Sequence, residues 1–178
     1  MKPMSSSPRI GTGMMAAGMM LTLAVITMWF NRAEEKKMHP NQELVSERTA
    51  VHTLVRLDRN RQGHYLARGE INGRTTDFLI DTGATDVVVP QQIAEKLELK
   101  QGRGAIAVTA NGTVKVYRTR IKRLSIGDIV LENVAASINP GMQGQAVLLG
   151  MSALSQVEFS QSGNELLIRQ YYPSTHDD

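Results

Sequence analysis

Cysteine is absent from this 178-residue chain. Its absence excludes disulfides, thiolate metal ligands and a cysteine nucleophile. Aromatic residues make up only 4% of the chain, so a core must be built mainly from valine, isoleucine and leucine. The four histidines, His39, His52, His64 and His176, show no HExxH or other metal-ligand spacing. This argues against a metal-dependent hydrolase, and we expect no metal and no cofactor.

A large charge of one sign is also lacking. The net charge is +3, and residues 51–178 hold fourteen Lys/Arg against thirteen Asp/Glu. A near-neutral body argues against nucleic-acid binding. One basic cluster remains, comprising Arg118, Arg120, Lys122 and Arg123. A solvated strand face is the favoured interpretation of this cluster, and a binding patch is the alternative.

The amino-terminal region holds one long uncharged run, residues 10–30. A membrane-spanning helix needs about 20 apolar residues, so we expect a transmembrane anchor there, behind a short cytoplasmic leader at 1–9. A cleaved signal peptide is the competing interpretation, but the run is long for one and its exit lacks a small-x-small site. Residues 31–50 are polar and charged, which predicts a linker.

In the remainder of the chain, 51–172, short strand-like runs alternate with residues typical of tight turns. Asn-Gly pairs at 72–73 and 111–112 separate strand-like runs, and such pairs favour hairpins because both residues tolerate positive φ. Only 90–99 and 151–156 resist assignment to strands and suggest short helices. The pattern predicts one all-β domain, followed by a disordered tail at 173–178.

The run FLIDTGATDVVVP, residues 78–90, carries the strongest chemical signal. An apolar strand delivers Asp81, and the chain then breaks at Gly83, which lets another backbone approach closely. Asp-Thr-Gly alone is a common turn. The apolar runs on both sides favour a functional aspartate over an ordinary surface turn. Burying an aspartate between them would cost free energy unless it had a partner or a function.

A second signal is VLLGMSALSQVEF at 147–159, where branched apolar residues end at Gly150. Together with GHYLARGEING, TANGTVKVY and IGDIVLENV, in this order, the two runs resemble the retropepsin-like aspartic peptidases. The resemblance is greatest to single-domain bacterial members anchored in a membrane. It covers nearly all of residues 51–170 and implies a closed, half-barrel acid-protease fold with one or two short helices.

The resemblance also implies roles for single residues. Asp81 would be the catalytic carboxylate, and Thr82 would make hydrogen bonds across a dimer. Gly83, followed by Ala84 in the same active-site loop, would leave room for substrate. The remaining positions implied are a flap tip and two residues beneath the loop: Ala110, Asn111 and Gly112 in the flap, and Leu149 and Gly150 in the support.

Aspartic peptidases need two carboxylates that share one proton, because like charges this close cannot both ionise. This chain has one Asp-Thr-Gly, so we expect a homodimer, joined through the active-site loops and the termini, that acts on a peptide or protein. The anchor and the long carboxy-terminal body suggest a single-pass protein of the bacterial inner membrane with a periplasmic peptidase domain. The alternative is a catalytically inactive binding or scaffold module, because fold alone does not give function.

Overall fold

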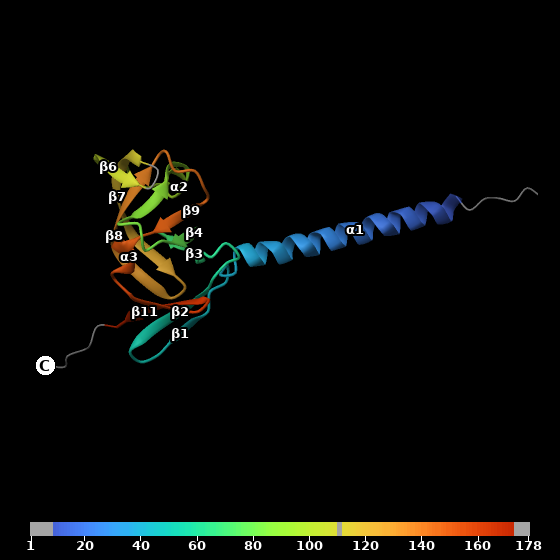
Figure 1. Cartoon of the computed structure of the whole chain (residues 1–178), viewed down its shortest axis with the longest axis horizontal. Coiled ribbons are helices and arrows are strands. Elements are labelled where there is room, and N and C mark those ends of the chain that lie inside the picture. Colours follow the sequence, from blue (N-terminus) through green and yellow to red (C-terminus); the bar gives the residue numbers. More distant parts are fainter. Residues whose placement is uncertain (1–8, 110–111, 173–178) are drawn as a thin grey trace, which may run out of the picture. The chain divides into compact units, whose positions relative to one another are not determined.

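The structure, a computed structural model, describes residues 9–109 and 112–172 (Figure 1). The chain divides into two compact units, Met1–Met38 and His39–Asp178. The first contains helix α1 (Arg9–Met38). Its stretch Gly13–Met38 is long and apolar enough to cross a membrane, judged by length and composition alone. The predicted leader lies almost wholly outside the described residues, as does the predicted tail at 173–178.

The prediction of a linker over 31–50 needs correction at both ends. Helix α1 runs on to Met38 rather than ending at residue 30. The added turns are rich in glutamate and lysine, which favour helix. Lys36 and Lys37 lie in the last turn, where a positive charge interacts favourably with the helix dipole.

The other end of that segment is folded into the body. The side-chain amide of Asn41 donates to the carbonyls of Asp58 and Leu66 at 2.9 and 2.7 Å, and its oxygen accepts the Asp58 N–H at 2.7 Å. Asn41 is only 4% exposed, so these bonds satisfy a buried amide. A short strand, β1 (Ser46–Arg48), then pairs with β2. The body therefore begins at His39 rather than at residue 51.

The body is built mainly of antiparallel strands, which confirms the predicted all-β class. A four-stranded sheet has the order β1-β2-β11-β10, and a seven-stranded sheet has the order β3-β4-β9-β5-β8-β7-β6. The remaining elements are β2 (His52–Asp58), β3 (Leu66–Ile71), β4 (Arg74–Ile80), β5 (Val87–Pro90), α2 (Gln91–Lys96), β6 (Gly104–Thr109), β7 (Gly112–Ile126), β8 (Ile129–Asn139), β9 (Ala146–Leu149), α3 (Met151–Leu154), β10 (Glu158–Ser162) and β11 (Glu165–Tyr171).

The turns follow the predicted chemistry. Asn72 and Gly73 have φ of 52° and 79° and join β3 to β4 in a two-residue hairpin, the geometry that Asn-Gly favours. The two short predicted helices are present as α2 and α3. The hairpin of β6 and β7 is also present, with Thr109 opposite Gly112, although its tip residues lie outside the described part of the chain.

The larger sheet curls far enough for β3 to pair also with β7, through Glu70–Ser125 and Ile71–Leu124. This pairing closes a partial barrel, in which the strands surround one apolar core (Figure 1). The parallel pairing of β4 with β9 brings the carboxyl ends of these two strands together, with Ile80 opposite Leu149. The candidate site lies where these two strands end.

Candidate active site

The Asp-Thr-Gly loop, residues 81–86, connects β4 to β5. Phe78 on β4 is fully buried, and β4 is paired on both sides, with β3 and β9. The sheet therefore fixes the strand up to Ile80, and Asp81 is the first residue beyond it. This agrees with the expectation that Asp81 lies at the tip of a rigid strand.

The backbone of the loop is held from below by the turn that follows β9. The N–H of Asp81 donates to the Leu149 carbonyl at 3.1 Å, and the N–H of Met151 donates to the Ala84 carbonyl at 2.8 Å. A side chain on Gly150 would put its Cβ 2.2 Å from the carbonyl oxygen of Asp86. Only glycine fits there, and Leu149 and Gly150 both lie against the loop.

Ser152, which was not predicted from the sequence as a site residue, forms a second set of hydrogen bonds that holds the loop. Its hydroxyl donates to the Ala135 carbonyl at 2.7 Å and accepts the Val87 N–H at 2.9 Å. Its own N–H donates to the Thr85 carbonyl at 2.9 Å. The side chain thus joins α3, β8 and the end of the loop. The only signal in the sequence was its place two residues after Gly150.

The carboxylate of Asp81 is little engaged by its own chain. Its Oδ1 accepts the N–H of Gly83 at 2.9 Å, and no ion pair to it exists among the described residues. Thr82 and Gly83 are exposed, and Asp81 itself is half-buried. The expectation of a carboxylate buried between apolar runs therefore needs correction for the single chain, because the loop lies at the strand ends and faces outward.

The predicted flap is described only in part. Gly112 has a φ of 106°, and its carbonyl accepts the Thr109 hydroxyl at 2.8 Å. Ala110 and Asn111 lie outside the described residues. On β6, Ile106 and Val108 are 73% and 85% exposed. Two large apolar side chains on one exposed strand are available to contact another molecule.

Asp77, on strand β4 four residues before Asp81, has a different environment. Asp77 Oδ1 accepts a hydrogen bond from Nε of Arg68 at 3.0 Å and lies 3.1 Å from Nε2 of the buried His39. Burial acts to raise the pKa of Asp77, but the hydrogen bond from Arg68 and the adjacent His39 together hold it below its usual value. Asp77 is therefore committed to an ion-pair cluster.

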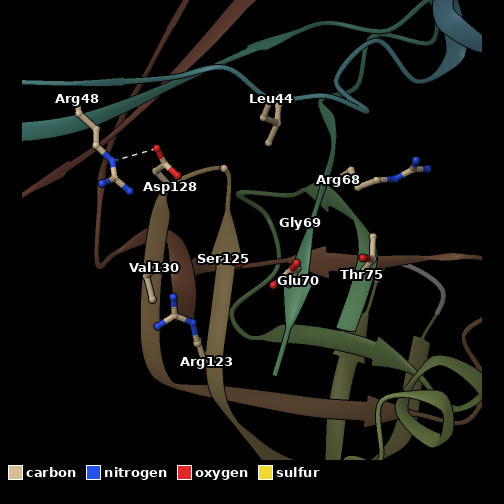
Figure 2. A pocket seen from close by; sticks show the side chains of 11 residues that line it. Leu44, Arg48, Arg68, Gly69, Glu70, Thr75, Arg123, Ser125, Asp128 and Val130 are labelled. Atoms are coloured by element: carbon tan, nitrogen blue, oxygen red, sulfur yellow. Dashed lines mark hydrogen bonds and ion pairs between the residues drawn. The ribbon is translucent and has the colours of Figure 1, made fainter. Parts of the chain in front are cut away.

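Two of the hollows on the body differ in the charge of their lining. One, of about 460 Å³, has basic and acidic side chains in near balance, with the Arg48–Asp128 pair at its rim (Figure 2). The other, of about 1170 Å³, includes Asp86 from the loop and is strongly basic. Among the described residues, no group of three or more His, Asp or Glu is arranged to hold a metal ion.

The fold and the loop agree with one protein family. The model of the gag-polyprotein putative aspartyl protease family matches residues 67–156, which include the Asp-Thr-Gly loop and the turn after β9. The chain belongs to this family. The predicted resemblance to retropepsin-like peptidases is thereby confirmed.

Two curated proteins are similar to this chain in sequence. The chain is 31% identical over 110 residues to an uncharacterised protein of Sinorhizobium sp, covering 60% of this chain and 47% of that protein. It is 30% identical over 118 residues to an uncharacterised protein of Rickettsia prowazekii (strain Madrid E), covering 64% and 49% respectively. The chain thus spans about half the length of these curated relatives.

A solved structure shares the fold. A retropepsin-like aspartic protease from Rickettsia conorii matches 72% of this chain and 96% of its own, with a TM-score of 0.55 and 23% identity. The match confirms the predicted retropepsin-like half-barrel.

Proposed function

We propose that this family member is an aspartic endopeptidase that works as a homodimer, with one Asp81 from each chain. The observation that carries the proposal is the Asp81 loop itself. Its backbone is fixed by bonds to Leu149 and Met151, yet its carboxylate has no cation beside it among the described residues. A rigid, half-exposed and uncommitted carboxylate is suited to receive a second carboxylate and a water molecule.

The chemistry needs both carboxylates. The ionised one removes a proton from water as the water oxygen attacks the carbonyl carbon of the peptide bond. The protonated one donates a hydrogen bond to the carbonyl oxygen and stabilises the charge that develops there. A proton then passes to the nitrogen, and the C–N bond breaks. Because this chain has one Asp-Thr-Gly, a two-fold axis must supply the second Asp81.

The neighbouring residues have supporting roles in this proposal. Exposed Thr82 hydrogen-bonds across the two-fold axis, and Gly83 leaves room for the substrate backbone. Ala84 is a fixed point of the loop, since its carbonyl accepts the Met151 N–H. Leu149 and Gly150 support the loop from below. The flap tip, formed by Ala110, Asn111 and Gly112, covers the bound peptide.

The dimer and the anchor fit together in the same proposal. The loops and the chain termini form the contact between subunits, and helix α1 holds both chains in one membrane. A shared anchor raises the effective concentration of the partner and so favours a weak dimer. The body lies outside the cytoplasm, in the periplasm of a bacterium with two membranes, and a protease-accessibility assay on spheroplasts tests this placement.

A peptide library tests the activity. The full chain in a neutral detergent is incubated with the library, and products are read by mass spectrometry. We expect wild-type cleavage, and a loss of about a thousandfold or more in Asp81→Asn. The matched control is Asp128→Asn, a surface aspartate on the β7–β8 turn paired with Arg48, which should cleave normally. Cleavage by Asp81→Asn within tenfold of wild type would contradict the assignment, as would an inert wild type.

A further inference from the structure

The larger hollow is a groove between the segment that follows α2 and the exposed face of β7. It has a volume of about 1170 Å³. Six of the described residues that line it are basic: Arg74, Lys100, Arg118, Arg120, Lys122 and Arg123. The basic cluster at 118–123, for which a solvated strand face was the favoured interpretation, thus forms one wall of a groove.

The positive charge of this groove is largely uncompensated. Among the described residues, two acidic ones line it, Asp86 and Glu98. Glu98 is already neutralised by Arg74, at 2.6 Å. No described carboxylate forms an ion pair with the other five basic side chains. Like charges gathered in one concave surface repel each other, and the field they create attracts an anionic partner.

The frame that holds these side chains is rigid. The N–H of Gly102 donates to the Arg118 carbonyl at 2.7 Å, and the Arg118 N–H donates to the Arg103 carbonyl at 3.0 Å. The hydroxyl of Thr119 donates to the Lys100 carbonyl at 2.8 Å. These bonds fix the two walls relative to each other, so the groove exists before anything binds.

The groove begins at the active-site loop. Asp86 lines it and is only five residues beyond Asp81. Five residues of chain span at most about 18 Å, and an extended peptide covers this distance with about six residues at roughly 3.3 Å each. A peptide bound at Asp81 therefore reaches the groove after a few residues, which favours a polypeptide over other anions as the occupant.

We infer that the groove binds an acidic segment of the polypeptide substrate, which sets which substrates are cleaved. The inference rests on the proposed peptidase function. The acidic residues lie about six or more positions from the cleaved bond, where they meet Arg118, Arg120 and Lys122. Asp86 repels acidic side chains that lie nearer to the bond.

Binding is measured apart from cleavage, with the full Asp81→Asn chain in a neutral detergent. The probes are two fluorescein-labelled peptides of equal length, one with a run of glutamates and one with glutamines in their place. Fluorescence anisotropy should show tighter binding of the glutamate peptide, and high salt should weaken it by screening. Adding Arg118→Gln and Arg120→Gln should weaken it about fivefold or more.

The matched control removes the same charge elsewhere, through Arg56→Gln and Arg59→Gln, which do not line the groove. It should leave binding within about twofold. Equal binding of the two peptides, or equal loss in the groove and control variants, would overturn the inference. A single-stranded oligonucleotide that displaces the glutamate peptide more effectively than unlabelled peptide does would also overturn it, and would assign the groove to nucleic acid.

Cleavage separates this inference from the proposed function. Peptides that the wild type cleaves are extended on either side by glutamates or by glutamines, beginning about six residues from the bond. We expect a higher kcat/KM with glutamates, lost in the Arg118→Gln, Arg120→Gln variant. Cleavage without that preference would overturn only the groove. Selective binding without any cleavage would contradict the peptidase, and with it the assignment of the groove to substrate.

Discussion

Asp77 and Asp81 stand four residues apart on one strand and its end, but their surroundings are opposite. Asp77 has Arg68 and His39 against its carboxylate. Asp81 has only the N–H of Gly83, and no cation among the described residues. A carboxylate that already has polar partners contributes to stability, whereas one held in place without them remains available to another molecule.

The backbone shows no such contrast, because the main chain is held in place at both residues, Asp77 within the paired strand β4 and Asp81 in its loop. The Asp81 loop is fixed by bonds from the turn after β9, including those of Leu149 and Ser152. Its lack of side-chain partners is therefore not a sign of a loose loop. The fold orders the main chain and leaves the carboxylate uncommitted, as expected where a reacting group must be preorganised.

The largest expected stability effect is at the support of the loop. In Gly150→Ala the new Cβ meets the Asp86 and Ala84 carbonyls at 2.2 and 2.6 Å, so the loop must shift. We expect a loss of about 3 kcal/mol in the free energy of unfolding, together with loss of cleavage. Denaturant unfolding measures the first effect. Gly141→Ala, where a Cβ meets nothing closer than 3.5 Å, is the control and should be nearly neutral.

A smaller effect is expected at Asp77. Asp77→Asn removes the charge that faces Arg68 and His39, and its side chain is 27% exposed. The pair is therefore partly screened by solvent, and we expect a loss of about 1 kcal/mol at neutral pH. Cleavage per folded dimer should be unchanged. If Asp77→Asn lost activity while remaining folded, the division of roles between the two aspartates would be wrong.

The pH dependence of that loss is the finest test of the comparison. The pKa of Asp77 is lowered in the folded chain from its ordinary 3.8, so its stabilisation is present above this value and is lost as the pH falls through the folded pKa. The difference in stability between wild type and Asp77→Asn should thus be constant near neutrality and shrink below about pH 4. A difference that grew on acidification would refute this sign.

The sequence was sufficient for the all-β fold and the position of the loop, because these depend on local signals. Asn72-Gly73 specifies a hairpin by its φ angles, and the apolar run before Asp81 specifies a buried strand. The turn at Gly150 was expected from the resemblance to the retropepsin-like peptidases, and the structure explains its glycine by the close approach of the Asp86 and Ala84 carbonyls.

What the sequence could not give depends on distant partners. Asn41 lies in a polar segment that resembles a linker, and only Asp58 and Leu66 reveal it as a buried anchor of the body. The role of Ser152 depends on Val87 and Ala135, which are far from it in the chain. Likewise, Arg118 and its neighbours form a groove wall only because the segment after α2 lies opposite them.

The central claim, that two Asp81 carboxylates from different chains form one site, is tested most directly by mixing subunits. Differently tagged wild-type and Asp81→Asn chains are mixed at constant total concentration, and their exchange is verified by co-purification. If the site is shared, activity follows the square of the wild-type fraction, about one quarter at equal amounts. Activity that fell only linearly, to about one half after verified exchange, would mean that each chain acts alone and would contradict the shared site.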